Sequence, residues 1–308
     1  MLVLGSAAGG GLPQWNCNDE ANRRARANDP LVLPRTQSSI AVSADGRRWA
    51  VLNASPDLRQ QISERPQLHP VADGPKRASP ISAVVVTNAD VDHVTGLLSL
   101  REGQPFALYG HERVLDILGR NSIFNVLNPT AVDRRPLPLD IPLALEDRDG
   151  VPLGIEVTAF IVPGKIALWL EDPSLPGFGS RAGDTIGLRL VSAAGSGPVF
   201  YIPGCAGMPP DLADRLRGAA LVFFDGTLWR DDEMILAGVG AKTGLRMGHL
   251  SCSGPQGAIA AFADLDVARK VFIHINNTNP LLIDDSPERA AAREAGWEIA
   301  FDGMEMTV

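Results

Sequence analysis

The chain has 308 residues, a formal net charge of −8 at pH 7 and a pI near 5.2. Hydrophobic residues make up 45% of it and charged residues 21%, which is typical of a folded α/β protein and excludes extensive disorder. The composition also excludes a nucleic-acid partner, because no segment supplies a basic stripe, so we expect a small-molecule ligand.

The first residues do not resemble an export signal. Residues 1–4 are apolar, but they lack a basic flank and run directly into a glycine-rich stretch. No apolar run approaches the length of a membrane span. The cysteines Cys17, Cys205 and Cys252 are far apart in the sequence, which predicts free thiols rather than a disulfide framework. We therefore expect a cytoplasmic protein without a membrane partner.

The beginning of the chain is predicted to form short strands and one helix. The strands are expected at residues 2–4, 39–43 and 49–53, and the helix at 57–64. Asp45-Gly46 between the second and third strands is a signal for a type I′ hairpin turn. The glycine-rich stretch after the first strand allows the backbone to bend tightly or to approach another group.

Apolar strands and helices alternate from residue 81 onward, which indicates crossover connections. Strands are predicted at residues 83–87, 106–109, 155–162, 186–191, 199–202, 221–224, 270–274 and 297–301. Helices are predicted at residues 94–101, 111–119, 210–216, 256–264 and 286–294. Residues 121–153 are proline-rich and show only a pairing around 137–145, and the loop at 173–184 is a candidate lid.

Hairpins and crossover helices occur in both halves of the chain. This combination predicts an α/β fold in which two mixed sheets lie between layers of helices. The sequence contains neither a linker nor an internal repeat. We therefore expect a single domain over residues 1–308.

Residues that can bind a metal ion follow three of the predicted strands. Asp90, Asp92 and His93 come after residues 83–87, Asp225 follows 221–224, and His274 ends 270–274. Sites are commonly built at strand ends, because the sheet fixes the backbone while the loop presents the side chains. Two imidazoles with one or two carboxylates suit iron, manganese or zinc, and two histidines with one carboxylate are typical of non-heme iron oxygenases.

Each of these residues also has a structural interpretation. Asp92 can cap a helix that begins near Val94, and Asp225 before a glycine can be a turn residue. His69 and His111 lie in proline-rich and helix-start contexts, where a solvated or capping role is expected. The joint placement of the other polar residues at strand ends favours the metal site.

The stretch "VVVTNADVDHVTGL" resembles the metallo-β-lactamase signature T-H-x-H-x-D-H-x-x-G. Asp92 and His93 are retained, whereas Asn88 and Asp90 stand where the first two histidines belong. The other motifs of the superfamily follow in order. By this resemblance "FFDGT" carries the bridging aspartate and "HINNTNP" the last histidine ligand, while "VPGK" has Lys165 in place of a histidine.

The whole chain closely resembles the pyrroloquinoline quinone (PQQ) biosynthesis protein B family. The motifs "PQWNC", "RTQSSIAV", "NADVDH", "FFDGT", "MGHLS" and "HINNTNP" are highly specific for it. The resemblance implies a metallo-β-lactamase αββα sandwich. Members commonly have a cysteine cluster able to hold a structural zinc, but Cys17 stands alone here and cannot complete a tetrahedral site.

The resemblance implies one metal ion instead of the usual two. Asn88 is a poor ligand, and the ammonium group of Lys165 would repel a cation at the first position. The second position remains, with Asp92, His93, His274 and Asp225 as its ligands. The implied cofactors are Fe(II), for which zinc can substitute, and O2 as co-substrate. The implied reaction is hydroxylation of the tyrosine ring of a Glu-Tyr-derived PQQ precursor.

Further residues are assigned to catalysis and to the substrate pocket. We expect Lys165 to pair with a substrate carboxylate and His249 to hydrogen-bond or shuttle a proton to the phenol, with Asp90 beside them. A buried loop histidine satisfied by the backbone is the alternative for His249. The expected pocket residues are Asn88, Ser38, Ser39, Asn276, Asn277 and Thr278.

Two other functions remain open at this point. A metal-dependent hydrolase of phosphodiester or amide bonds is disfavoured by the missing histidines, and a non-catalytic carrier of PQQ or its precursor is compatible with the composition. Zinc ranks above ferrous iron in affinity for such ligands, so the sequence leaves the metal open. It also leaves open the electron donor and whether the chain forms a homo-oligomer.

Overall fold

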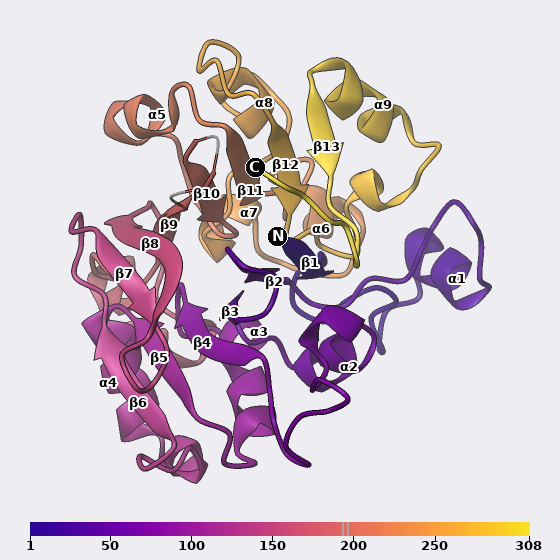
Figure 1. Cartoon of the computed structure of the whole chain (residues 1–308). Helices are drawn as coiled ribbons and strands as arrows, with labels where there is room; N and C mark the ends of the chain where they lie inside the picture. Colours follow the sequence, from indigo (N-terminus) through magenta and orange to yellow (C-terminus); the bar gives the residue numbers. More distant parts are fainter. Residues whose placement is uncertain (193, 196) are drawn as a thin grey trace.

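Two mixed β-sheets face each other in the computed structural model, which describes residues 1–192, 194–195 and 197–308 (Figure 1). Within these residues one sheet has six strands in the order β1-β2-β3-β4-β5-β6, and the other has seven in the order β13-β12-β11-β10-β9-β8-β7. Helices lie on the outer side of each sheet (Figure 1). The predicted αββα sandwich is thereby confirmed.

The first sheet begins with an antiparallel meander and continues with parallel strands. Its strands pair antiparallel from β1 to β3 and parallel from β3 to β6. They are β1 (Leu2–Gly5), β2 (Ser39–Val42), β3 (Trp49–Leu52), β4 (Ile81–Val86), β5 (Phe106–Gly110) and β6 (Val132–Pro136).

The second sheet repeats this arrangement in the second half of the chain. Its strands pair antiparallel from β7 to β10 and parallel from β10 to β13. They are β7 (Leu143–Glu146), β8 (Pro152–Ile161), β9 (Ile186–Ser192), β10 (Val199–Ile202), β11 (Leu221–Asp225), β12 (Lys270–Ile273) and β13 (Trp297–Ile299).

The helices are short, and none of those in the described residues is long and apolar enough to cross a bilayer. The α-helices are α1 (Glu20–Arg26), α2 (Leu58–Ser63), α3 (Val91–Val94), α4 (Glu112–Arg120), α5 (Pro210–Leu216), α6 (Glu233–Leu236), α7 (Gly244–Met247), α8 (Ala258–Ala261) and α9 (Pro287–Glu294). Six 3-10 turns within the same residues are η1 (Pro66–Leu68), η2 (Thr95–Leu100), η3 (Ser122–Val126), η4 (Leu168–Leu170), η5 (Pro176–Gly179) and η6 (Pro280–Leu282).

The central core lies between the two sheets. Val85 and Tyr109 of the first sheet pack with Leu188 and Phe223 of the second, and all four are buried. Because successive strand residues point to opposite faces, their neighbours form two further cores beneath the outer helices. The sheets are therefore held face to face, which fixes the strand ends of one sheet relative to those of the other.

The structure differs locally from three of the predictions. The β2–β3 hairpin forms, but Asp45 is not left-handed and instead accepts the backbone N–H groups of Arg47 and Arg48, so the turn is not of type I′. The helix predicted at 256–264 shortens to α8. The helix predicted at 94–101 is replaced by α3, which begins three residues earlier, and the 3-10 turn η2.

Gly96 explains the break after α3. Its N–H bonds to Ala54 O at 2.9 Å, and its α-carbon packs directly against the chain that leaves β3. A β-carbon at this position would overlap Ser55 O and lie 2.8 Å from the carbonyl carbon of Ala54. Only glycine permits this approach, which sets the position of α3 against β3.

We predict that Gly96→Ala destabilises the fold by more than about 2 kcal/mol, because the overlapping atoms are backbone and cannot move aside. Chemical denaturation monitored by circular dichroism measures the effect. Gly119→Ala in α4 is the matched control, since its new β-carbon meets only Arg134 Nη1 at 3.7 Å. The control is expected to be neutral or slightly stabilising, as alanine favours helix. Equal stabilities of the two variants would contradict the prediction.

Candidate metal centre

Three loops meet where parallel strands of the two sheets end. The turn after β4 leads through Asp90 into α3, which carries Asp92 and His93. Asp225 is the last residue of β11, and His274 directly follows the neighbouring strand β12. The central core holds β4 of one sheet against β11 and β12 of the other, so residues far apart in the sequence meet here.

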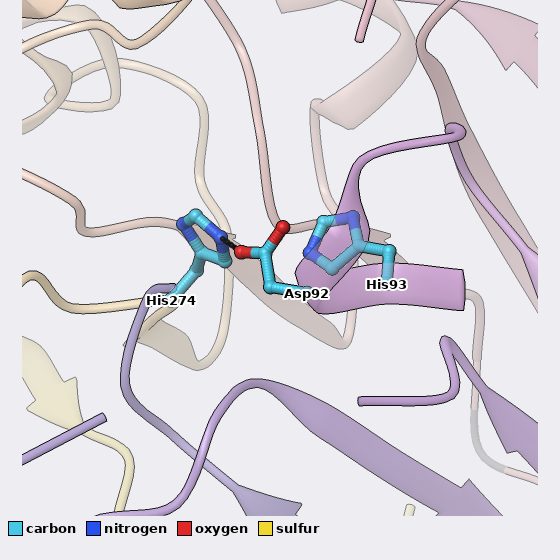
Figure 2. A group of neighbouring side chains, drawn as sticks. All are labelled: Asp92, His93 and His274. Carbon is cyan, nitrogen blue, oxygen red and sulfur yellow. Dashed lines mark hydrogen bonds and ion pairs between the residues drawn. The ribbon is translucent and has the colours of Figure 1, made fainter. Parts of the chain in front are cut away.

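Asp92, His93 and His274 form one group of candidate ligands. One ligand atom from each residue lies within 4.8 Å of the others. Figure 2 shows the Asp92 carboxylate between the two imidazole rings, and Nε2 of His274 is 3.1 Å from Asp92 Oδ2. The ring centroids of His93 and His274 are 5.2 Å apart. The structure therefore brings together the two histidines and the aspartate that the sequence predicted to share an ion.

The ring of His93 has one nitrogen held by the protein and one left without a partner. Its Nδ1 lies 2.8 Å from Asn88 Oδ1, and the amide oxygen can only accept, so Nδ1 carries the proton. Its Nε2 is buried and has no hydrogen-bond partner among the described residues. Burial lowers the pKa of His93 to about 4, so the imidazole is neutral. A buried lone pair without a partner indicates a ligand outside the chain, and a metal ion fits it.

His274 is held in a defined orientation by its backbone and by Thr227. Its φ of 61° is left-handed, which is uncommon for a residue other than glycine and is often found at functional sites. Its Nδ1 lies 2.8 Å from Thr227 Oγ1, which directs Nε2 toward Asp92. Burial alone would lower the pKa of His274, but the hydrogen bond and the charge of Asp92 raise it above its usual value.

Asp92 is ionised although its side chain is only 18% exposed. Desolvation would raise the pKa of this carboxyl, but the neighbouring His93 and His274 outweigh desolvation and hold it well below its usual range. One carboxylate and two imidazoles therefore converge on one point. This set fits a single divalent transition-metal ion with free coordination positions.

Asp225 belongs to a second group, with His249 and His274. Its Oδ2 accepts the Cys205 N–H at 2.8 Å and His249 Nδ1–H at 2.7 Å, and its Oδ1 accepts the N–H and O–H of Thr227 at 3.0 and 2.6 Å. Four donors occupy both oxygens of this buried carboxylate. The structure does not place Asp225 in the group of Asp92 and His93, and its role as a ligand stays a prediction.

His249 lies beside the candidate ligands. Its ring is stacked on that of His274, with the centroids 5.3 Å apart, and its Nδ1 bonds to the Asp225 carboxylate rather than to the backbone. This geometry leaves Nε2 of His249 as the nitrogen that can meet a substrate. Its expected catalytic role stays a prediction.

Asp90 and Lys165 both contact residues 166–171, the segment that follows Lys165. Asp90 Oδ1 accepts the N–H of Leu168 at 3.0 Å, and burial together with the charge of Asp92 raises the pKa of Asp90. The Lys165 ammonium group lies 3.3 Å from Glu171 Oε1 and 3.2 Å from the carbonyl oxygen of Ile166. Lys165 therefore already has a carboxylate partner within the chain.

The expected pocket residues are tied into the protein by hydrogen bonds. Asn88 orients His93, and the other five bond to partners inside the chain: Ser38 with Tyr201, Ser39 with Asn53, Asn276 with Thr278, Asn277 with Gln14 and Thr278 with Glu233. Their contact with a substrate stays a prediction. His111 caps α4, as expected, and the three cysteines are free and buried.

Sequence reasoning missed two residues that shape the site. Thr227 contacts Asp225, His249 and His274 through one hydroxyl group. Gly9 lets the N-terminal loop approach Asp92, because a β-carbon there would lie 3.3 Å from Asp92 Oδ2. The available signals were their positions, since Thr227 lies two residues after Asp225 and Gly9 lies in the glycine-rich stretch.

Known proteins match this chain over its full length. A coenzyme PQQ synthesis protein B from Gluconacetobacter diazotrophicus is 57% identical, with 100% of this chain and 99% of the relative covered. A relative of the same name from Rhodopseudomonas palustris is 53% identical with the same coverage. The chain belongs to the coenzyme PQQ synthesis protein B family. The beta-lactamase superfamily domain matches residues 48–275, which confirms the superfamily.

A solved structure of the same family supports the fold throughout. The crystal structure of Zn2+-bound PqqB from Methylobacterium extorquens matches with a TM-score of 0.93 and 50% identity, covering 100% of this chain and 99% of that one. A diphosphatase of the PhnP family matches with a TM-score of 0.67 at 20% identity, with 100% of this chain and 96% of that one covered, and shares the fold alone. The family predicted from the sequence motifs is thereby confirmed.

We predict that Thr227→Val lowers the affinity for Zn2+ by roughly 10–100-fold, because His274 and Asp225 lose the hydroxyl group that orients them. Competition with a chromogenic chelator measures this affinity. Thr158→Val is the matched control, since Thr158 is also buried but makes no side-chain hydrogen bond to the described residues. The control should bind zinc like the wild type, and equal losses in both variants would contradict the prediction.

We also predict that Zn2+ affinity weakens as the pH falls. Without metal, His274 is protonated below its raised pKa, so an ion must displace one proton, and affinity drops about tenfold per pH unit there. The ion displaces no second proton from His93 until the pH approaches the pKa of His93, about 4. Chelator competition between about pH 6 and about pH 8 tests this. A pH-independent affinity, or a two-proton slope near pH 6, would contradict it.

Proposed function

We propose that this protein acts in PQQ synthesis as an iron- and O2-dependent hydroxylase of the tyrosine ring of a Glu-Tyr-derived precursor. The observation that carries the proposal is the group of Asp92, His93 and His274, in which the buried Nε2 of His93 lacks a partner among the described residues. Two histidines and one carboxylate with open positions are the ligand set of non-heme iron oxygenases. The names of the curated relatives support the pathway.

Ferrous iron at these three residues would supply the binding and reductive activation of dioxygen. One oxygen atom enters a ring C–H bond to give a phenol O–H, the other leaves as water, and an external reductant such as ascorbate supplies two electrons. Zinc cannot supply this chemistry, because it has no redox activity in proteins. The Methylobacterium extorquens relative binds Zn2+, and because zinc exceeds ferrous iron in affinity for such ligands, bound zinc does not exclude iron in this protein.

The side chains around the ion would position the substrate. Asp225 holds His249 through Nδ1, so Nε2 of His249 accepts the phenol proton of the substrate and keeps the ring oriented. Lys165 provides a cation for a substrate carboxylate. Asp90, whose pKa is raised by burial, lies between the metal ligands and the segment that follows Lys165.

The composition of the site favours a hydroxylase over a binuclear hydrolase. Hydrolases of this fold hold a second ion through further histidines, where this chain has Asn88 and Lys165. Asn88 is committed to His93, and Lys165 brings a positive charge. A chain without those ligands lacks the means to activate a hydroxide between two ions.

We expect O2 uptake only when the anaerobically iron-loaded protein, ascorbate and the cross-linked Glu-Tyr precursor are all present. Asp92→Asn should abolish uptake by removing the negative ligand, whereas Asp149→Asn in the exposed turn before β8 should retain it. An oxygen electrode measures uptake, and mass spectrometry detects the added oxygen atom. Precursor binding without uptake in the iron-loaded wild type would indicate a carrier, and precursor cleavage would indicate a hydrolase.

A further inference from the structure

One carboxylate near the metal centre is surrounded by three cationic side chains. Glu171, which follows the turn η4, lies 3.3 Å from Lys165 Nζ, 3.7 Å from Lys242 Nζ and 2.6 Å from Arg246 Nη2. Its side chain is only 9% exposed, whereas those of Lys242 and Arg246 are 41% and 30% exposed. Solvent and ligands can therefore reach the cations from outside.

The cations outnumber their partner, in a protein whose net charge is −8. Glu171 neutralises one of the three charges. Asp90 and Asp231 accept the N–H groups of Leu168 and Leu245, and neither forms an ion pair with the three cations within the described residues. An excess of positive charge on an acidic protein attracts an anionic ligand to this place.

This cation cluster adjoins the candidate metal centre. The side chain of Lys165 packs on Gly248, the residue before His249, where a β-carbon would lie 3.1 Å from Lys165 Cγ. The segment that carries Glu171 also rests on the turn before Asp92, because the indole N–H of Trp169 donates to Ala89 O at 3.1 Å. A molecule that contacts His249 can therefore reach the cluster with a second group.

The contacts of Glu171 show how these cations can bind a carboxylate that is attached to an aromatic ring. Arg246 grips both oxygens, at 3.2 and 2.6 Å, in the paired geometry that guanidinium groups form with carboxylates. This hydrogen bonding lowers the pKa of Glu171 to about 2, so the carboxylate stays ionised. The guanidinium group also lies over the ring of Phe178, 3.6 Å from its centroid, which adds an aromatic wall.

We propose that Lys165, Lys242 and Arg246 form a carboxylate-binding subsite, and that Glu171 is a resident carboxylate which an anionic ligand replaces. The proposal deepens the proposed function, on which it rests for the substrate class: an aromatic polycarboxylate whose ring lies at His249. Replacement of Glu171 releases one end of the segment that covers Ala89 and Asp90, so carboxylate binding and access to the metal centre are coupled.

A purely structural role for Glu171 makes the opposite prediction. If Glu171 only fastens its segment to α7, its loss loosens the site and ligand binding weakens. If Glu171 competes with the ligand, its neutralisation removes the competitor and ligand binding becomes tighter. The direction of the change in affinity therefore separates the two roles.

The test is equilibrium binding of PQQ, a coloured aromatic tricarboxylate, to the zinc-loaded full chain. Glu171→Gln, which keeps the side-chain volume, should tighten the Kd roughly tenfold, and Arg246→Met should weaken it roughly tenfold, with partial rescue in Arg246→Lys. Glu298→Gln is the matched control. Glu298 lies on the edge strand β13 and forms a two-bond salt bridge with Arg269, as Glu171 does with Arg246. This control should bind PQQ like the wild type.

The proposed subsite would be overturned if Glu171→Gln left the Kd for PQQ unchanged or raised it. A complete lack of PQQ binding would also overturn it. Circular dichroism and zinc content verify that each variant is folded. If Arg246→Met does not fold, the change in Kd of Glu171→Gln decides alone. Zinc has no redox activity in proteins, so these binding results stand apart from O2 uptake. Missing uptake with the expected changes in Kd would reject only the hydroxylase.

Discussion

The contact between Asp92 and His274 is the interaction on which the site depends. Asp92 follows a strand of the first sheet and His274 a strand of the second, so their 3.1 Å approach exists only while the sheets stay face to face. The central core between the sheets provides this constraint through packing. A shift of one sheet by a fraction of a strand spacing would separate the aspartate from the histidine, which links the stability of the core to metal binding.

Around that contact, the protein fixes the orientation of each ring through a different partner. Asn88 holds Nδ1 of His93, Thr227 holds Nδ1 of His274, and Asp225 holds Nδ1 of His249. In each ring, Nε2 therefore points away from the residue that holds Nδ1. A buried carboxylate with four donors, such as Asp225, is costly to desolvate but is well compensated, so it serves as a rigid anchor.

The fold and the two-histidine, one-aspartate group could be predicted from the sequence, because hydrophobic periodicity and strand-end placement are local signals. Contacts between distant segments could not. Asn88 was expected to line a pocket, yet it orients His93 across one turn of chain. Thr227 contacts His274 and Gly9 packs against Asp92, and no sequence pattern predicts either contact. The short helix α3 likewise follows from the packing of Gly96 against Ala54, which no propensity of residues 94–101 reveals.

The electrostatics of the two neighbouring regions fit one substrate pose. The metal ligands bring a negative carboxylate and two imidazoles into a buried place, which favours a cation. The side chains of Lys165, Lys242 and Arg246 are 19%, 41% and 30% exposed, so the cluster can attract anions from solvent. A substrate with carboxylates at one end and a phenol at the other would bind with the acid groups on the cluster and the ring at His249. The opposite pose would set the phenol, instead of a carboxylate, against the three cations and would forgo these ion pairs.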